Sequence, residues 1–463
     1  MGKLNQLFDG IFNDGEFYRK MLKIAIPIVI QNFISSFLNM IDTVMVGRLG
    51  ETEIAAVGIA NQYFFFFNMF ILGMSAGCGV FISQFWGKRE NQNIKRILGI
   101  GLGSAALISM AFMVLGYLIP GKIIAAFNSD PRVIHLGAGY LQVVLVSYIF
   151  TGVTFVYNFA LRSIGKTVQP MLISAVALIC NAFFNYMFIF GKFGAPAMGV
   201  EGAALATVIA RLIEVLALIA FVYNKKSVLA ASFAELTDIN FKYFKQAYRT
   251  IFPVILNDIC WGLGSLVYAA VYGRMGTQAV AAVQISNTVS NLFLVAIFGM
   301  SNAAAVMVGN SIGAGDLGLC RSYARRFSIL SVAVGIVLGL FLAAASPALS
   351  KVFNVSSKVR SDSLIILNIV ALIFFIRVFD VILIVGILRG GGDARYAFLL
   401  EGFTMWFIGV PLTILGAFAF KLPVAIVYAL AVLEEISKCI IGVLRLKSGR
   451  WVRNVIHNMG KSC

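Results

Sequence analysis

Charge is scarce in this chain of 463 residues: Asp, Glu, Lys and Arg together make up 12% of it, whereas 60% is hydrophobic. So little charge excludes a soluble domain, and apolar segments of about 20 residues recur along the whole length. The apolar runs are continuous rather than alternating, which excludes a transmembrane barrel. The sequence therefore predicts an all-α polytopic membrane protein whose main solvent is the bilayer.

Histidine and paired cysteine are also missing. The two histidines, His135 and His457, are too far apart in the sequence to suggest a ligand cluster. The six cysteines form no Cys-x-x-Cys pair and mostly lie inside apolar runs, where cysteine behaves as a small hydrophobic residue. We expect no disulfide, no resident metal and no other cofactor. The chain has no His-Glu-x-x-His motif, and we do not expect an enzyme.

The net charge of +17 does not indicate a nucleic-acid partner, because the basic residues lie between the apolar spans. We expect twelve spans, at about residues 17–44, 54–84, 94–119, 133–158, 168–190, 199–223, 243–272, 279–311, 323–346, 362–387, 396–418 and 423–446. Most of the 37 Lys and Arg residues fall in the connections on one side, if Lys438 is counted after the last span. By the positive-inside rule this side, with both termini, is cytoplasmic. We expect a monomer in the plasma (inner) membrane, surrounded by lipid.

The chain repeats itself after 226 residues. Residues 27–50, PIVIQNFISSFLNMIDTVMVGRLG, align with residues 253–276, PVILNDICWGLGSLVYAAVYGRMG, and the register continues without a gap to give 16 identities in 61 positions. A second echo, LRSIGKT at 161–167 against LRGGGDA at 388–394, is offset by 227. Internal parallel repeats of this length are typical of secondary transporters.

The longest polar interruption falls where the first repeat unit ends, at residues 224–242. We expect a cytoplasmic linker there, between a six-helix lobe at 1–223 and a second at 243–463. Residues 233–252 carry aromatic side chains with basic residues between them. This pattern predicts either a helix lying in the cytoplasmic interface or a solvated linker that runs straight into span seven.

Asp42 is the only acidic residue in the stretch 27–50. A carboxylate in a run long enough to cross a bilayer is costly, and its default interpretation is functional. The second repeat has Tyr268 at this position, so we expect the function of Asp42 to belong to the first lobe alone. The alternative is a structural carboxylate near a helix end, because GRLG follows closely. Pro27 shares the span with Asp42, and we expect it to act as a hinge.

Several motifs in order give the chain a family resemblance: MIDTVMVGRLG at 40–50, LRSIGKT at 161–167, NAFFNYMFIFG at 181–191, GVEGAALAT at 199–207, GMSNAA at 299–304, LRGGGDAR at 388–395 and WFIGVP at 406–411. Together with the twelve-span layout, they make the chain resemble the multidrug and toxic compound extrusion (MATE) family of cation-coupled exporters. The resemblance implies two six-helix lobes related by a pseudo-two-fold axis. It also implies a large cavity between the lobes that opens alternately to the two sides.

The resemblance further implies a cation or proton site in the first lobe, formed by Asp42, Asn158, Asn181, Asn185 and Thr207. Asn181 and Asn185 are four residues apart and so share a helix face. Contacts between helices are the alternative role for the two asparagines, and packing is the alternative for Thr207. Some family members have an aspartate where this chain has Asn185, so this site has less charge for Na⁺. The coupling ion is H⁺ or a Na⁺ bound at Asp42, and we favour H⁺.

Further polar residues within the spans are candidates for a substrate cavity: Gln31, Asn32, Asp258, Asp380 and Glu401. Asp258 is the strongest candidate in the second lobe for contact with a cationic substrate. Asp380 follows Arg377 by three residues, a spacing that predicts a buried ion pair.

Arg211 and Glu214 have the same spacing and are expected to neutralise each other. We therefore expect an antiporter that exports amphipathic, cationic compounds in exchange for H⁺ or Na⁺. The alternative is a flippase of lipid-linked sugars, a group that resembles this fold. A flippase predicts a groove lined by several arginines, whereas only Arg211 and Arg377 lie well inside the predicted spans, away from their ends, and both have acidic neighbours.

Overall fold

The computed structural model describes residues 14–352, 355–457 and 459, most of which are helical. The first half contains, in chain order, α2 (Gly15–Gly47), α3 (Glu51–Lys88), α4 (Asn91–Leu118), α5 (Pro120–Ala125), α6 (Pro131–Val144), α7 (Ser147–Ser163), α8 (Val168–Phe190) and α9 (Gly199–Asn224). After the short α10 (Phe233–Thr237), the second half contains α11 (Phe241–Met275), α12 (Thr277–Gly313), α13 (Leu317–Val352), α14 (Ser357–Val381), η1 (Ile382–Leu388), α15 (Ala394–Phe403), η2 (Thr404–Gly409), α16 (Val410–Ile414), η3 (Leu415–Ala419) and α17 (Val424–Lys447). The η segments are π-helical turns within the tenth and eleventh spans.

The helices agree with the twelve predicted spans, and most extend a few residues beyond them. Within the described residues, ten helical segments are long and apolar enough to cross a bilayer, and α6 with α7 forms an eleventh that bends by 52°. The twelfth is α17, which packs along α14 and carries Glu434, Glu435 and Lys438 in its middle. Those three charged residues make α17 less apolar than the other spans.

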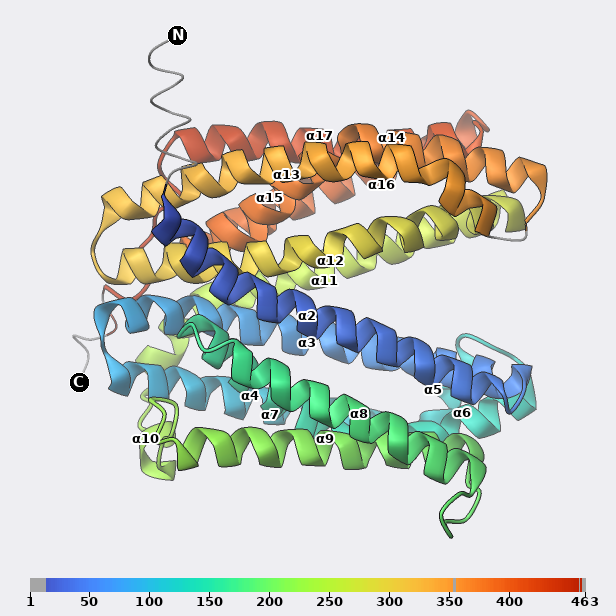
Figure 1. The fold of residues 1–463 in the computed structure, drawn as a ribbon, viewed down its shortest axis with the longest axis horizontal. Coiled ribbons are helices and arrows are strands. Elements are labelled where there is room, and N and C mark those ends of the chain that lie inside the picture. Colours follow the sequence, from blue (N-terminus) through green and yellow to red (C-terminus); the bar gives the residue numbers. More distant parts are fainter. Residues whose placement is uncertain (1–13, 353–354, 458, 460–463) are drawn as a thin grey trace.

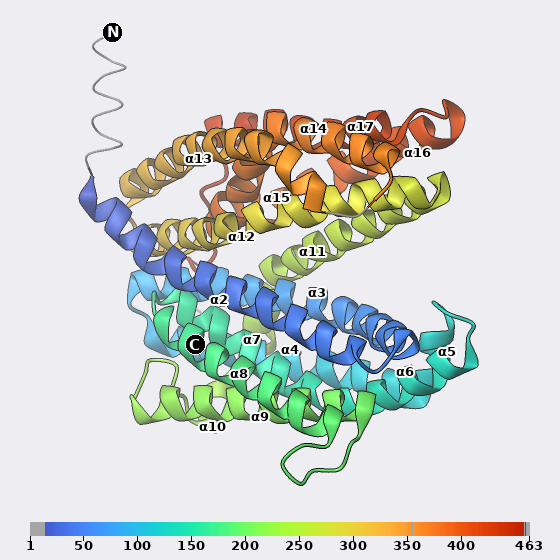
Figure 2. The same ribbon diagram turned by 45° about the vertical axis from the view of Figure 1, so that its right-hand side comes forward.

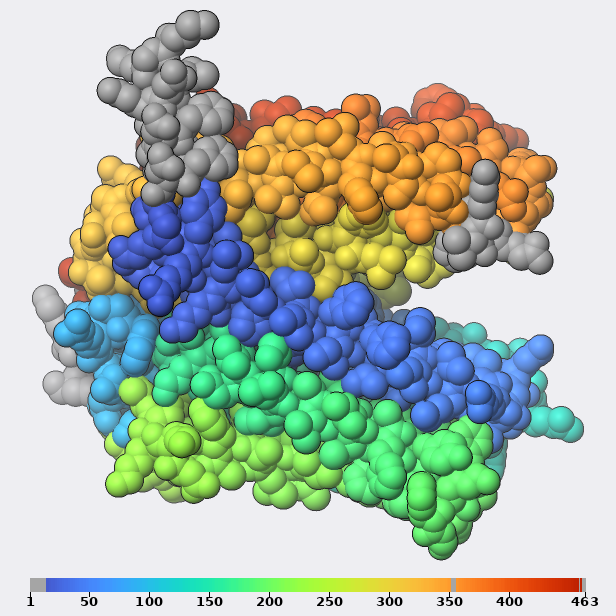
Figure 3. Space-filling model, in the orientation of Figure 1, coloured from blue at the N-terminus to red at the C-terminus, as the bar shows by residue number. Residues whose placement is uncertain are grey.

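The helices form two lobes, α2–α9 and α11–α17 (Figures 1 and 2). The lobes meet near the end of the molecule where α10 and the last described residues lie, which we name the basic end because its connections are rich in Lys and Arg. They diverge toward the opposite end, named the open end, which includes the connections 47–51 and 275–277. Figure 3 shows the surface hollowed between α2 and α12 on that side.

Each lobe has a hydrophobic core, and α2 and α11 each contribute to both cores. Residues 17–28 of α2 pack in the core of the second lobe, whereas Val46 near the end of the same helix packs in the first. Residues 243–255 of α11 pack in the core of the first lobe, and Val271 packs in the second. The two helices are equivalent in the repeat, so they cross between the lobes as a symmetric pair.

Glycines let the lobes approach closely. A Cβ added to Gly73 of α3 would lie 2.7 Å from the Cα of Ile255, and one added to Gly299 of α12 would lie 2.7 Å from the carbonyl oxygen of Ala25. Gly73 and Gly299 are equivalent in the repeat. The same close helix contact is therefore built twice, as is typical of small residues in membrane bundles.

The repeated Gly-Arg-x-Gly motif has a backbone reason. Its last glycine, Gly50 or Gly276, is the residue directly before the second long helix of each repeat, α3 or α12. Gly276 has φ +116° and ψ 166°, a region that is essentially reserved for glycine. In both repeats, a glycine with positive φ therefore precedes the second long helix.

The linker between the lobes is docked on α4. Lys95 lies 2.7 Å from the carboxylate of Glu235 in α10, and Arg96 lies 2.6 Å from Asp238. The hydrogen bond from Lys95 holds the pKa of Glu235 below its ordinary value of 4.5, and the hydrogen bond from Arg96 does the same for Asp238. From Phe241 onward the chain is one continuous helix into span seven, which matches the second of the two predicted arrangements.

Candidate functional site

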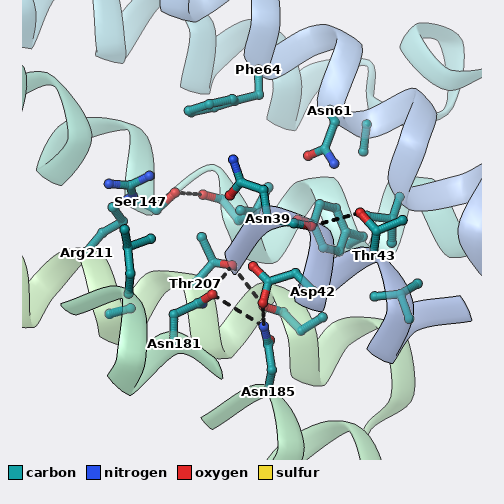
Figure 4. Close-up of a pocket in the computed structure, with 18 of the residues that line it drawn as sticks. Asn39, Asp42, Thr43, Asn61, Phe64, Ser147, Asn181, Asn185, Thr207 and Arg211 are labelled. Atoms are coloured by element: carbon teal, nitrogen blue, oxygen red, sulfur yellow. Dashed lines mark hydrogen bonds between the residues drawn. The ribbon is translucent and has the colours of Figure 1, made fainter. Parts of the chain in front are cut away.

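A polar cavity of about 430 Å³, here called the first-lobe cavity, lies between α2, α3 and α6–α9 (Figure 4). Its lining residues recur three or four positions apart on each helix, because such residues share one face. The polar lining groups are Asn39, Asp42 and Thr43 of α2, Asn61 and Asn68 of α3, Tyr140 of α6, Ser147 of α7, Asn181 and Asn185 of α8, and Thr207, Arg211 and Glu214 of α9. Four of the five residues implied for the ion site therefore lie together.

Hydrogen bonds connect these four residues across three helices (Figure 4). Asn185 Nδ2 donates to the Asp42 carboxylate at 2.7 Å and to Asn181 Oδ1 at 3.3 Å. Asn181 Nδ2 in turn lies 3.5 Å from Thr207 Oγ1. Asp42 is thus held by a neutral amide rather than by a cationic side chain.

The arrangement leaves oxygen atoms available to a cation. Asn185 Oδ1 is buried and has no hydrogen-bond partner among the described residues, since both hydrogen bonds of this side chain are donated by its amide nitrogen. Carboxylate, amide and hydroxyl oxygens are ligands that a hard cation prefers. A carboxylate is also a group that can carry a proton. These residues therefore fit either H⁺ or Na⁺.

The charges that line the cavity leave one net negative charge. Arg211 Nη1 donates to Glu214 Oε2 at 2.8 Å, so the predicted ion pair is present and its charges cancel. Asp42 is the remaining ionisable acid among the lining residues. The cavity is therefore suited to a single positive charge.

Several predicted residues lie outside this cavity. Asn158 is buried on α7, is not among the lining residues, and has an Oδ1 without a partner among the described residues. Pro27 is buried inside α2, which continues through it as one helix. Gln31 is buried and hydrogen-bonded within the first lobe, and Asn32 is partly buried beside it.

Asp258 of α11 contacts Arg389 at the end of η1, and Arg389 also donates to Asn257. The second carboxylate oxygen of Asp258, Oδ2, is buried without a partner among the described residues. Asp258 is therefore only partly neutralised.

A group of buried charges, here called the second-lobe cluster, consists of Glu401, Glu434 and Lys438. Lys438 Nζ lies 2.8 Å from Glu401 Oε1 and 2.8 Å from Glu434 Oε1. Tyr268 donates to the other oxygen of Glu434 at 2.6 Å. Counting Lys438 in the connection after the last span was wrong, because it is 7% exposed inside α17. The i, i+4 spacing of Glu434 and Lys438 was the available signal.

The predicted pair of Arg377 and Asp380 is also wrong. Arg377 Nε instead donates to Glu435 of α17 at 2.8 Å, because its long side chain reaches the neighbouring helix. Asp380 is 5% exposed, and neither of its carboxylate oxygens has a hydrogen-bond partner among the described residues. The i, i+3 spacing of Arg377 and Asp380 along one helix therefore did not determine the ion-pair partner of Arg377.

One pattern typical of catalysis escaped the sequence reasoning: GMSAG at residues 73–77 matches Gly-x-Ser-x-Gly. In hydrolases that serine occupies a sharp turn between a strand and a helix. Here the five residues lie inside α3, Ser75 is 1% exposed, and the two glycines pack against Ile255 and Ile251 of α11. The motif serves helix packing.

Comparison with known proteins gives a consistent result. A family model described as MatE matches residues 27–187 and 253–415, which begin at the two equivalent prolines. A probable multidrug resistance protein NorM of Thermotoga maritima is 24% identical over 444 residues, which covers 95% of this chain and 94% of that protein. The multidrug resistance protein MdtK of Edwardsiella ictaluri is 25% identical over 404 residues, which covers 85% and 86% of the two chains.

Solved structures share the fold. A structure of MATE in the bent conformation has a TM-score of 0.86 at 17% identity and covers 94% of this chain and 97% of its own. A mutant of the Vibrio cholerae MATE transporter VcmN has a TM-score of 0.86 at 17% identity and covers 95% and 98%. These likenesses establish the two-lobe architecture.

Proposed function

The chain belongs to the multidrug and toxic compound extrusion family of ion-coupled membrane transporters, and from that premise we propose that it exports amphipathic, cationic compounds in exchange for H⁺ or Na⁺. The observation that carries this proposal is Asp42, an acid within a span whose carboxylate is held by Asn185. Its cavity retains one net negative charge, so one cation neutralises it. Binding of that cation on one side of the membrane and its release on the other then couple export to the ion gradient.

The composition of the cavity favours H⁺ over Na⁺. A Na⁺ site gains from a second carboxylate, whereas Asn181 and Asn185 supply only neutral oxygens here. Burial of a lone carboxylate among neutral groups makes uptake of a proton easier. Na⁺ is the alternative because the same oxygens suit a hard cation.

We place the basic end in the cytoplasm of a cell whose inner membrane the protein spans as a monomer. The distribution of Lys and Arg supports this orientation through the positive-inside rule. The open end then faces outward, and export requires the lobes, residues 1–223 and 243–463, to move about the linker at 224–242. Pro27 is the proposed hinge of α2, because the helix changes lobes next to it.

Cationic substrates are proposed to contact acids within the spans of the second lobe. Asp258 remains the leading candidate because one of its oxygens lacks a partner among the described residues. Asp380 also has unsatisfied oxygens, whereas Glu401 is already paired with Lys438. Gln31 and Asn32 lie at the same level of the first lobe as the repeat equivalents of Asn257 and Asp258.

Efflux of the lipophilic cation ethidium from proteoliposomes tests the proposal. The purified protein is reconstituted, and a pH gradient and a Na⁺ gradient are imposed separately. The proposal predicts ethidium transport under one of the two gradients, with H⁺ favoured. Transport driven by a Na⁺ gradient at equal pH, with no response to a pH gradient alone, would rule out H⁺ coupling. Flipping of a lipid-linked sugar without any ion-driven efflux would support the flippase alternative.

A further inference from the structure

Helix α2 passes from one hydrophobic core to the other close to Pro27. Residues 17–28 pack in the second-lobe core, whereas the later part of the helix packs against α8 of the first lobe. Helix α11 makes the reverse crossing near Pro253, the repeat equivalent of Pro27. Movement of one lobe relative to the other must change the path of both helices at these crossings.

An arginine holds an amide at each crossing. Arg162 Nη2 donates to Gln31 Oε1 at 2.8 Å, and Arg389 Nε donates to Asn257 Oδ1 at 3.1 Å. Gln31 and Asn257 are equivalent at the offset of 226, and the two arginines are equivalent in the echo at 227. Both arginines also line a pocket of about 50 Å³ between the lobes. The repeat has therefore preserved this contact in three dimensions.

The two crossings differ in the further contacts that the arginine and the amide side chain make. In the second lobe, Arg389 also contacts the carboxylate of Asp258, so its charge is neutralised locally. In the first lobe, two more hydrogen bonds follow the one from Arg162. Gln31 Nε2 donates to Ser174 Oγ at 2.9 Å, and Ser174 Oγ donates to Glu214 Oε1 at 2.6 Å. The second step ends in the first-lobe cavity, because Glu214 lines it.

The chemistry of the four side chains determines which group donates and which accepts in each hydrogen bond of the chain between Arg162 and Glu214. Arginine has no acceptor, so Gln31 must turn its oxygen to Arg162 and its amide nitrogen to Ser174. Ser174 accepts from Gln31, and its single hydroxyl hydrogen therefore goes to Glu214. Gln31, Ser174 and Glu214 are each at most 8% exposed, so the chain is shielded from solvent. Every donor points toward the carboxylate of Glu214.

Glu214 shares the first-lobe cavity with Asp42, so an ion bound at Asp42 acts on the charge of Glu214. Both acids line the first-lobe cavity, and Arg211 of the same cavity pairs with the second oxygen of Glu214 at 2.8 Å. A positive charge that arrives at Asp42 changes the field at this ion pair, because charges inside a protein interact strongly. Hydrogen bonds to a carboxylate are about twice as strong as bonds between neutral groups. The bond from Ser174 therefore changes strength with the occupancy of the cavity.

We propose that Ser174 and Gln31 are positioning residues that transmit ion occupancy from the first-lobe cavity to Arg162 at the crossing of α2. The inference rests on the proposed ion-coupled transport and adds the route by which the ion controls the lobes. When an ion binds, the hydrogen bonds that connect Glu214 to Arg162 weaken, and α2 changes its path between the two cores. The crossing of α11 stays tied to Asp258 and does not respond.

The test measures coupling in proteoliposomes, as the ratio of ethidium exported to H⁺ or Na⁺ taken up. Ser174→Ala removes the link without changing any charge or any residue of the Asp42 site. We expect the ratio to fall about fivefold or more, the lower range of measured coupling between sites. Ser174→Thr keeps the hydroxyl and should retain the wild-type ratio. Ser109→Ala is the matched control, because Ser109 is buried in the same lobe but, among the described residues, hydrogen-bonds only to the backbone of Tyr148.

Gln31→Met breaks the next link and supplies the same readout if Ser174→Ala does not fold. Wild-type ratios in Ser174→Ala and Gln31→Met would overturn the inference while leaving ion-coupled export intact. Equal impairment in Ser174→Thr and Ser174→Ala would also overturn it, because that result indicates packing rather than hydrogen bonding. A wild-type protein that moves neither ethidium nor ions under any gradient would contradict the proposed function itself.

Discussion

Tyr268 occupies in the second repeat the position that Asp42 occupies in the first, and the two side chains play opposite hydrogen-bonding roles. Asp42 accepts a hydrogen bond from Asn185, whereas Tyr268 donates one to Glu434. The carboxylate that Tyr268 contacts therefore lies on another helix, α17, where Lys438 also pairs with Glu434. Duplication preserved the backbone of the two lobes, while the charged groups diverged.

Removal of Lys438 should destabilise the protein. Lys438→Met leaves Glu401 and Glu434 buried without the cation that both contact, and breaking a buried ion pair costs about 3 to 5 kcal/mol. Thermal unfolding of the purified protein in detergent measures the effect. Adding Glu434→Gln should restore part of the loss. Lys447→Met, an exposed lysine of the same helix, is the control, and equal melting of both single variants would refute the assignment.

A side chain at Gly299 should keep the basic end from closing. Its Cβ would lie 2.7 Å from the carbonyl oxygen of Ala25, so Gly299→Val forces α2 and α12 apart. We expect faster labelling by a thiol reagent of a cysteine introduced at Ala305, which lines the pocket between the lobes. Gly273→Val is the control, because a Cβ there meets no atom within 4 Å. Unchanged labelling in Gly299→Val would show that this contact does not control closure.

Docking of the linker on α4 should weaken only at acidic pH. The pKa values of Glu235 and Asp238 are lowered by hydrogen bonds from Lys95 and Arg96, so their stabilising contribution is present above the ordinary carboxylate range. It is lost as the pH falls below the ordinary carboxylate range and through the lowered values. A spin label at Ala234 should therefore be immobile at pH 7 and become mobile in that acidic range.

Lys95→Met is the companion to this measurement, because it removes one of the two contacts at every pH. The label should then be more mobile at pH 7 as well. A mobility that changes near pH 6 to 7 in the wild-type protein would contradict the assignment to these carboxylates.

Sequence reasoning located the spans and the repeat, and the family resemblance supplied four residues of the first-lobe cavity. Six of its polar lining residues, among them Asn39 and Asn61, were not predicted. Asn181 and Asn185 were predictable because their spacing determines a shared helix face. The partners of Arg377 and Lys438 were not predictable, because both lie on other helices and depend on how the second lobe packs. The exchange of α2 and α11 between the cores was missed for the same reason.

The choice of ion should respond to the residue at position 185. Asn185→Asp adds a second carboxylate beside Asp42, which raises the negative charge of the first-lobe cavity. We expect transport to shift toward dependence on Na⁺, measured as ethidium efflux under separate Na⁺ and pH gradients. Asn61→Asp, which adds a charge elsewhere on the lining, controls for charge alone. An unchanged ion preference in Asn185→Asp would argue against direct ligation by this residue.

The most direct test of the account is ethidium efflux by Asp42→Asn in proteoliposomes under each ion gradient. Asparagine keeps the shape of the side chain and removes the charge that the ion neutralises. We predict that efflux falls to the level of empty liposomes while expression and melting temperature stay near those of the wild type. Glu51→Gln, an exposed acid on the nearby connection, should transport normally. Efflux by Asp42→Asn at the wild-type rate under both gradients would contradict the assignment of Asp42 as the coupling site.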